Sequence, residues 1–490
     1  MNKFSIDLHC HPCMKPFAWS FDKHGKPGTN STRDTDRSSA WHYDPPQGND
    51  TLPQAFGVTK FSQSDFATLT YGNVRLICAS MYSIERGFVC MEGLDTGPLA
   101  DICAKLVSSL GANRIKFLQE NKDYFKDLQD EYAFYKSLNN KVVRYMNTKR
   151  KYVMVGNFAE LEEAIAANEQ SGVETVYVIS TVEGLHNLNT GIDYSQPPNE
   201  DEVMANLIAL KDWEYAPFYV TFAHHFYNQL CGHAKTMEGF SNLLLNQDLG
   251  LNEGFTDLGR KVLKALLSKK NGRRIYIDIK HMSYKARNEY YNYLKNEYPA
   301  EYARKEFPLI ISHGACNGLI SERDPNYHPA LQKTAPYMYQ ADINFYDHEI
   351  VEVARSGGII GLQLDERRIA STAYKKKLRV SGSKTEQRHS NSKMLWNNIQ
   401  HIVQLLDMHD MYAWDCMAIG SDNDGMIDPI NQFWTAEDMD DLLQYIERHA
   451  YDFFKDEKTI LKNDYNRISP AEVVDRIFQS NAYEFFRKYF

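Results

Sequence analysis

Short apolar runs alternate along the chain with longer segments whose apolar residues recur at helical spacing. The first run alternates Phe4 and Ile6 with Ser5 and Asp7, which is the period of a β-strand. The next run, VRLICASMY at 74–82, is apolar almost throughout and also predicts a strand. Eight such runs are predicted as strands: 4–9, 74–82, 175–182, 218–223, 274–280, 308–312, 358–364 and 416–421.

Segments with helical periodicity lie between these strands, and a further short run at 152–155 is left out of the count of eight. Strands that alternate with helices indicate parallel βα units, and eight such units predict a closed barrel. The predicted fold is therefore α/β, a (β/α)8 TIM-type barrel. Helices are expected at about 99–110, 123–146, 159–169, 257–269, 286–296, 348–355, 394–407, 436–449 and 470–488.

Long insertions are expected after the first strand, before the third and around the seventh, within one domain that spans 1–490. The first insertion has the Pro, Gly, Ser and Asn content of a loop but also carries Trp19 and Trp41. It either covers a pocket at the barrel end or packs on its own domain. The polar, basic segment 375–393 is expected to be exposed. The insertions lie at about 15–70, 83–150 and 324–395.

Composition excludes several classes of protein. A net charge of −9, without a basic stripe, argues against nucleic acid as a partner. We see no signal peptide and no run approaching roughly 18 apolar residues, so neither secretion nor a membrane span is expected. The eight cysteines are scattered, which favours free thiols in a reducing cytoplasm. Cys10 and Cys13 form a C-x-x-C, but at the end of a strand a redox role is the weaker interpretation.

Polar residues mark the ends of the predicted strands. His9 and His11 are two residues apart on a strand, so their imidazoles point to the same face. The carboxyl ends of barrel strands form the site-bearing rim of this fold. Any one such residue can be a satisfied core or surface group, but their convergence on one rim predicts a metal site. The residues are His9, His11, Glu183, His224, His281, His313 and Asp422.

Imidazole and carboxylate donors suit zinc best, and manganese, iron or cobalt fit the same donor types. Six ligands exceed a tetrahedral shell, so two ions are expected, with Glu183 as the bridge. The expected nucleophile is a metal-bound hydroxide, with Asp422 moving its proton and His224 facing the developing oxyanion. Arg323 is a candidate partner for a substrate carboxylate, although a solvated loop arginine is equally in keeping with its position.

The strand-end motifs resemble those of the amidohydrolase superfamily and, within it, the membrane (renal-type) dipeptidases of peptidase family M19. The resemblance implies a zinc dipeptidase in which Glu183 bridges, His281 and His313 bind metal, His224 contacts substrate and Asp422 is the acid/base. It also implies a homodimer. The matching segments are 182–186 (VEGLH, like E-G-G-H), 219–224 (YVTFAH, like Y-L-T-L-T-H), 278–283 (DIKHMS, like D-L-S-H-V-S), 308–313 (PLIISH, like P-V-I-F-S-H) and 420–425 (GSDNDG, like G-x-D-F-D-G).

The chain departs from this pattern at three points. The family has His-x-Asp on the first strand, whereas this chain has His9-x-His11, which raises the charge of the metal cluster by one. The spacing after the fourth strand is one residue longer, so His225 is an alternative to His224. The insertions are expected to change the loops that cover the pocket at the metal-bearing end of the barrel.

Three functions remain open at this point. The first is hydrolysis of a dipeptide or similar small amide. The second is hydrolysis of another small ester, lactone, cyclic amide or phosphoester on the same metal centre. The third is a catalytically silent barrel that binds a small ligand, against which Glu183 and Asp422 argue, because binding alone needs neither a bridge nor a proton shuttle.

Overall fold

The computed structural model describes residues 3–46, 61–90, 110–145, 147–169, 171–237, 245–379, 381–456 and 461–490. Eight parallel strands close into a barrel, because β2 and β5 pair directly and the other strands follow in chain order from β5 to β10, which pairs with β1. All eight predicted strands are confirmed. They are β1 (Ser5–Cys10), β2 (Val74–Met81), β5 (Glu174–Glu183), β6 (Tyr219–Thr221), β7 (Tyr276–Asp278), β8 (Ile310–Gly314), β9 (Ile359–Leu362) and β10 (Met417–Ile419).

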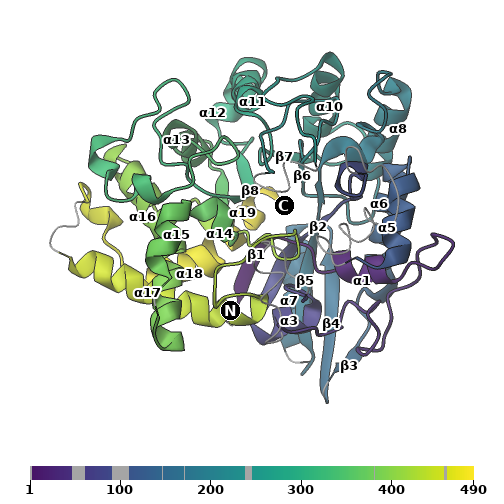
Figure 1. Cartoon of the computed structure of the whole chain (residues 1–490), viewed down its shortest axis with the longest axis horizontal. Coiled ribbons are helices and arrows are strands. Elements are labelled where there is room, and N and C mark those ends of the chain that lie inside the picture. The colour runs from purple at the N-terminus through teal and green to yellow at the C-terminus, as the bar shows by residue number, and fades with distance from the viewer. Residues whose placement is uncertain are drawn as a thin grey trace.

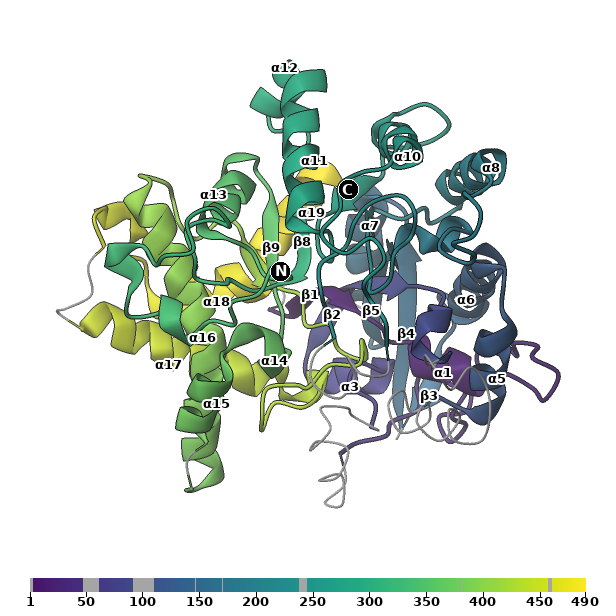
Figure 2. The same ribbon diagram turned by 45° about the horizontal axis from the view of Figure 1, so that its top comes forward.

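Helices surround the barrel on all sides (Figures 1 and 2). α10 shows why: Val262, Leu263, Leu266 and Leu267 lie on one face and are buried, and the Thr256 side chain caps its first turn. The helices are α1 (Met14–Trp19), α3 (Phe66–Tyr71), α5 (Ala112–Glu120), α6 (Tyr124–Leu138), α7 (Phe158–Glu169), α8 (Glu200–Lys211), α10 (Asp257–Leu267), α11 (Tyr284–Glu297), α12 (Pro299–Ala303), α13 (Asp347–Arg355), α14 (Glu366–Ile369), α15 (Thr372–Leu378), α16 (Lys384–Met408), α17 (Met439–Lys455), α18 (Pro470–Asp475) and α19 (Asn481–Tyr489).

The helix predicted at 123–146 is too long. It ends at Leu138, because Asn139 leaves the helical conformation with a ψ of 128° and Asn140 then takes a left-handed backbone with a φ of 58°. The chain then forms an antiparallel hairpin of β3 (Val143–Tyr145) and β4 (Thr148–Val155). The run left out of the strand count is thus part of β4, which pairs with the first half of β5 outside the closed ring and extends from one end of the molecule in Figure 1.

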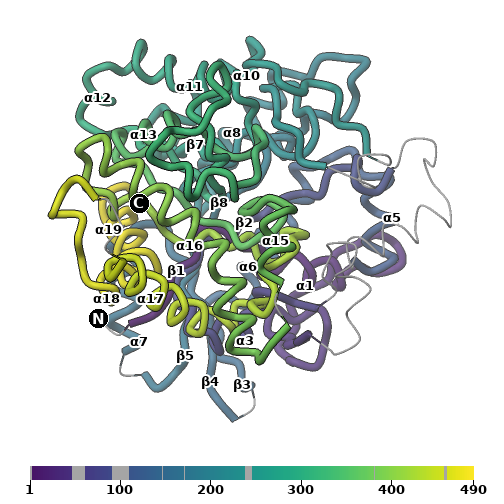
Figure 3. The backbone as a smooth tube through the Cα atoms, turned by 60° about the vertical axis from the view of Figure 1, so that its left-hand side comes forward, coloured from purple at the N-terminus to yellow at the C-terminus, as the bar shows by residue number. Residues whose placement is uncertain are grey.

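Two other predictions need comment. The polar segment 375–393 is largely exposed, as predicted, but it is helical: α15 and the first turns of α16 occupy most of it, and Ser383 and Glu386 form a capping box. The helix expected at 99–110 lies almost entirely outside the described residues. Figure 3 shows α15, α16 and α17 side by side along one flank of the barrel.

The N-terminal end of the barrel is closed by aromatic residues. Phe485 and Phe486 of α19 belong to the same buried cluster as barrel residues Leu76 and Ile310. The Phe218 ring lies 5.8 Å from that of Phe486, in an edge-to-face arrangement. One end of the barrel is therefore sealed by apolar packing, which leaves the other end for chemistry.

The described helices and the Cys10 and Cys13 thiols bear on two further predictions. None of its helices combines the length and the apolar character that crossing a bilayer requires. Cys10 and Cys13 are buried and not disulfide-bonded. Burial raises the pKa of both thiols well above the ordinary value, which disfavours the reactive thiolate.

Candidate metal centre

Glu183, at the end of β5, lies at the centre of a cluster of histidines. The carboxylate is almost fully buried, and five imidazole Nε2 atoms surround it at 3.3–3.6 Å. The histidines lie at or just beyond the carboxyl ends of four strands, β1, β6, β7 and β8, as expected for this fold, and β1 supplies two of them. The distances to Glu183 are 3.3 Å from His11, 3.4 Å from His281, 3.5 Å from His9, and 3.6 Å from both His224 and His313.

The donors fall into two sets that share Glu183. His9 and His11 form one set with it, and His281 and His313 form the other; within each set the donor atoms all lie within 4.8 Å of one another. The Nε2 atoms of His281 and His313 are 3.2 Å apart. A carboxylate with two oxygens between two sets of imidazoles is the arrangement that a pair of divalent ions requires.

Asp422, after β10, lies across both sets. Its Oδ1 is 3.6 Å from His11 Nε2 and 3.8 Å from His9 Nε2, and its Oδ2 is 3.9 Å from His313 Nε2. Its backbone has a φ of 63°, in the left-handed region that aspartate tolerates. The Asp422 side chain is 14% exposed, against 4% for Glu183, so it is the carboxylate that a substrate can reach.

Several buried ring nitrogens lack a hydrogen-bond partner among the described residues. They include both nitrogens of His9, Nε2 of His11 and Nδ1 of His281. Buried polar atoms are rarely left unpaired, so these donors need an explanation. The donor set of imidazoles and carboxylates fits zinc or a related divalent ion.

Burial and neighbouring charges set the protonation of the cluster. Burial would raise the pKa of Glu183, but the charges of His224 and His9 hold it well below its usual range. Burial lowers the pKa of His281 to about 3 and that of His313 well below the ordinary value. The pair His281 and His313 is therefore neutral at pH 7 and keeps lone pairs for an ion.

His11 behaves differently from that pair. Burial lowers its pKa, but Asp422 and Glu183 outweigh burial and raise it to about 9. Its Nδ1 lies 2.8 Å from the Ser80 carbonyl oxygen, which fixes the ring and directs Nε2 at Glu183.

Two buried aspartates hold the strand ends in place. Asp7 accepts hydrogen bonds from the Ser421 N–H and hydroxyl and from the His9 N–H, which ties β1 to β10. Asp278 accepts from the Thr221 hydroxyl and from Ser312 in the same way, which ties β6 and β8 to β7. Asp7 thus orients the backbone that carries His9 rather than the imidazole itself.

The structure places His224, not His225, at the central carboxylate. His224 Nδ1 lies 2.7 Å from Glu85 Oε2, and Nε2 lies 3.6 Å from Glu183. His225 instead pairs its Nδ1 with the Thr236 hydroxyl, and its ring centroid is 4.8 Å from that of His281. His225 is therefore adjacent to the cluster, where one of its ring nitrogens lies within 4.8 Å of donor atoms of His224 and His281, but no contact with Glu183 is found in the described structure.

Arg323 makes no contact with the cluster in the described structure. It lies exposed in the loop after β8, and no ion pair or hydrogen bond of its side chain to the histidines is found in the described structure. The sequence pattern gave its distance from His313 along the chain but not the path of the loop.

Three residues of the site were missed by sequence reasoning. Glu85 lies in the unmatched insertion, so no motif pointed to it, although it holds His224. His186 is buried beside Glu85, with Nδ1 3.9 Å from Glu85 Oε1. The sequence offered a sign of this residue, because His186 is the last residue of the VEGLH motif. Lys280, directly before His281, is buried, and its ammonium has no hydrogen-bond partner in the described structure.

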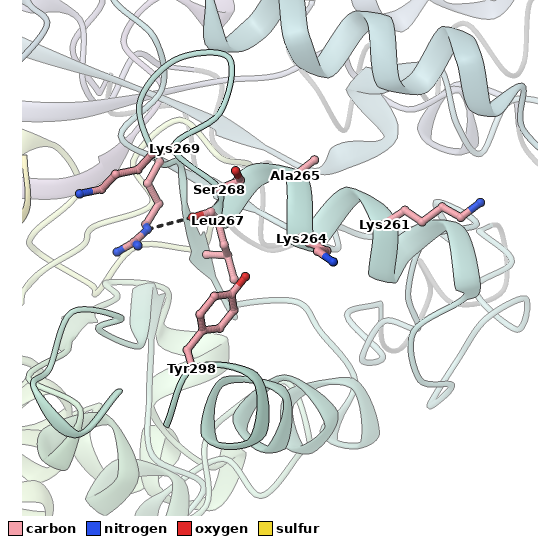
Figure 4. Close-up of a pocket in the computed structure, with 8 residues that line it drawn as sticks. Lys261, Lys264, Ala265, Leu267, Ser268, Lys269 and Tyr298 are labelled. Atoms are coloured by element: carbon pink, nitrogen blue, oxygen red, sulfur yellow. Dashed lines mark hydrogen bonds between the residues drawn. The ribbon is translucent and has the colours of Figure 1, made fainter. Parts of the chain in front are cut away.

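Glu85 and His186 also line a pocket of about 330 Å³ beside the cluster. Its walls include the aromatic side chains of Tyr124, Tyr194 and Phe226. A second pocket, of about 460 Å³, lies on α10 and is lined by lysines, including Lys264 (Figure 4). Arg274, which also lines it, precedes β7, so this second pocket is at the opposite barrel end from His281.

Comparison with known proteins gives a likeness of fold. No protein-family model matches the chain, and no curated protein sequence matches it. A metallopeptidase from Rhodobacter sphaeroides, solved with a phosphinate mimic of the dipeptide L-Ala-D-Ala, matches with a TM-score of 0.50 and 12% identity over 99% of both chains. A dipeptidase of peptidase family M19 matches with a TM-score of 0.47 and 13% identity over 90% of this chain and 94% of the other.

A probable dipeptidase, PvdM from Pseudomonas aeruginosa, gives a TM-score of 0.42 and 14% identity over 87% of this chain and 88% of the other. At 12% identity, the match with a TM-score of 0.50 shows the fold alone. The predicted (β/α)8 barrel is confirmed, and the metallopeptidase from Rhodobacter sphaeroides shares this fold.

Proposed function

We propose that the protein is a zinc-dependent hydrolase that cleaves a dipeptide or a similar small amide at a binuclear site. One observation carries the proposal: five imidazoles surround the Glu183 carboxylate at 3.3–3.6 Å, and Asp422 lies across both donor sets. The motifs that resemble family M19, and the fold shared with a metallopeptidase that binds a dipeptide mimic, support this substrate class.

The residues present fit the metal. His9 and His11 would hold one ion and His281 and His313 a second, with Glu183 shared between them. Bound divalent ions supply positive charge that polarises the scissile carbonyl and lowers the pKa of a water. Burial of the donors keeps bulk water from competing for these positions.

Asp422 is the group that we assign to proton transfer. It is the more exposed carboxylate, and burial raises its pKa above the ordinary value, with the Glu183 charge acting in the same direction. A carboxylate with a raised pKa is a stronger base, so it takes a proton from water more readily, and the carboxyl group so formed can then pass that proton to the leaving amine.

His224 is assigned to the oxyanion. Glu85 accepts from its Nδ1, which leaves Nε2 as a donor directed at the centre of the cluster. Burial lowers the pKa of His224, but Glu85 and Glu183 outweigh it and raise the pKa above the ordinary value. A protonated Nε2 stabilises negative charge that develops on the attacked carbonyl oxygen.

The second candidate is hydrolysis of another small ester, lactone, cyclic amide or phosphoester. The observation that favours it is His11 in place of the family's aspartate, because the additional positive charge suits a more anionic substrate.

The test is release of free amino acids from a panel of L-L and L-D dipeptides by zinc-reconstituted protein. We expect cleavage that is lost on chelation and in Glu183→Gln, and retained in Glu163→Gln, an exposed α7 carboxylate that serves as the matched control. A protein that is fully loaded with zinc and cleaves no dipeptide would contradict the proposal, and the panel would then be replaced by small esters, lactones and phosphoesters.

A further inference from the structure

The pocket of about 330 Å³ beside the metal centre is walled by the loops that follow β2, β5 and β6. Neither Glu183 nor Asp422 is among the described residues that line it, so it is distinct from the positions assigned to the ions. Tyr194 and Leu249 line the pocket and are 45% and 55% exposed, so the pocket meets solvent at these side chains. Apolar side chains at the mouth favour a ligand that has an apolar part.

The buried end of the pocket presents two hydrogen-bond acceptors that face each other. His186 Nε2 lies 2.7 Å from the Ser83 carbonyl oxygen, which only accepts, so Nε2 carries a proton and Nδ1 a lone pair. Burial lowers the pKa of His186 despite the Glu85 charge, which keeps the ring neutral at pH 7. Nδ1 has no hydrogen-bond partner in the described structure and lies 3.9 Å from Glu85 Oε1, too far for a bond between them.

The Glu85 oxygen that faces His186 has unused capacity. Oε2 accepts from His224 Nδ1 at 2.7 Å, whereas Oε1 receives, among the described residues, only a long bond of 3.4 Å from the Phe226 N–H. Arg86 also lines the pocket, but its Nε donates to a backbone carbonyl, and no ion pair between Arg86 and Glu85 is found in the described part of the chain. A buried lone pair beside a carboxylate oxygen is unfavourable unless a donor lies between them.

The aromatic walls favour a donor that is also a cation. Tyr124, Tyr194 and Phe226 line the pocket, and the Tyr124 ring lies 5.2 Å from the His186 ring in an edge-to-face arrangement. The faces of aromatic rings attract ammonium groups, and hydrogen bonds from an ammonium to a carboxylate are strong. An ammonium about 2.9 Å from both acceptors would span the gap between Nδ1 and Oε1, because it has three N–H donors.

We propose that this pocket binds a primary ammonium group on an apolar stem, with the ammonium between His186 Nδ1 and Glu85 Oε1. The stem then lies along Tyr194 and Leu249 at the mouth. The ammonium belongs either to a free alkylamine or to an amine-bearing side chain of a substrate. Binding of the amine does not depend on the proposed dipeptidase activity, and only the second source does.

The experiment is calorimetric titration of zinc-loaded protein with n-butylammonium and with two probes that each lack one of its properties. The probe n-butanol lacks the charge, and tetramethylammonium lacks N–H donors. We expect n-butylammonium to bind at least about tenfold more tightly than either probe, because only n-butylammonium makes charge-assisted hydrogen bonds to both acceptors.

Substitutions at the wall and at the buried end separate the two contributions. Tyr194→Ala should weaken n-butylammonium binding about three- to tenfold, whereas Tyr194→Phe keeps the ring, loses only the hydroxyl bonded to the Tyr227 carbonyl, and should change binding less than about twofold. His186→Leu removes the acceptor and should weaken binding about ten- to a hundredfold. Tyr451→Ala, exposed on α17, is the control and should change nothing.

Equal binding of the three probes would overturn the proposal, as would absence of n-butylammonium binding or unchanged binding in both Tyr194→Ala and His186→Leu. The source of the amine follows from KM for dipeptides with and without lysine. A lower KM with lysine, lost in Tyr194→Ala, assigns the pocket to a substrate side chain, and equal KM values assign it to a free amine. A protein that binds n-butylammonium in this way but cleaves no dipeptide would refute the proposed function and support the pocket.

Discussion

The two ends of the barrel differ in the kind of side chain that fills them. At the N-terminal end, Phe218, Phe485 and Phe486 fill the opening with apolar packing. At the C-terminal rim, buried imidazoles and carboxylates face one another, and several of their atoms have no partner in the described structure. The first arrangement lowers the free energy of the fold, and the second raises it unless ions and substrate are bound.

This difference explains why changes at the two ends should be separable. Substitutions at the rim remove interactions that are made with ligand, so they should change turnover more than stability. Substitutions at the aromatic end remove buried contacts, so they should change stability while the folded fraction keeps its metal affinity.

Asp422→Asn is expected to have the largest effect. An amide cannot take up a proton as the carboxylate does, so kcat should fall by about 10²–10⁴-fold while the protein stays folded. The measurement is kcat for a cleaved dipeptide together with zinc content, and Asp201→Asn, exposed on α8, is the matched control. Loss of zinc from the variant would show that Asp422 acts mainly as a ligand.

Phe486→Ala tests the aromatic end. Phe486 is fully buried, and truncation of a buried phenylalanine costs about 3–5 kcal/mol of unfolding free energy. Urea or thermal unfolding measures this, and Tyr451→Ala, at a side chain that is 55% exposed, should change stability by less than about 0.5 kcal/mol. A variant that unfolds like the parent but loses zinc affinity would contradict the division between the two ends.

Glu85→Gln tests whether the insertion at 83–150 orients a histidine of the metal centre. Glu85 holds Nδ1 of His224 at 2.7 Å, and loss of a partner that orients a site imidazole typically costs about 10- to 100-fold in activity. The expected result is a lower kcat with unchanged zinc content, because Glu85 does not contact the two proposed ligand sets. An unchanged kcat would mean that His224 is oriented without Glu85.

The sequence predicted the eight strands because each is a short apolar run between helical segments, and it predicted the convergence of His9, Glu183 and Asp422 because parallel strands share one rim. It could not predict Glu85, since a contact with His224 across 139 residues leaves no local pattern. It left open whether Arg323 pairs with a substrate carboxylate or is a solvated loop arginine, because loop paths depend on packing that spacing does not encode. Asn140, by contrast, is a residue type that commonly ends helices, and the prediction of a helix over 123–146 from periodicity overlooked it.

His449→Gln has the smallest expected effect and sharpens the comparison, because His449 is a buried histidine away from both ends that has a partner. Its Nε2 lies 2.9 Å from the Ser392 hydroxyl. Burial, with Lys393 and His389, lowers its pKa to about 2, so the folded protein holds it neutral. The unfolded chain takes up a proton below about pH 6.5, so His449 stabilises the fold above that pH, and the contribution is lost as the pH falls.

Between pH 6.5 and 5.5 the unfolding free energy should fall by about 1 kcal/mol less in His449→Gln than in the parent, whereas exposed His24→Gln should follow the parent. Identical pH profiles for parent and His449→Gln, at equal zinc content, would mean that His449 is protonated in the fold, and that a hydroxyl partner does not hold a buried histidine neutral here.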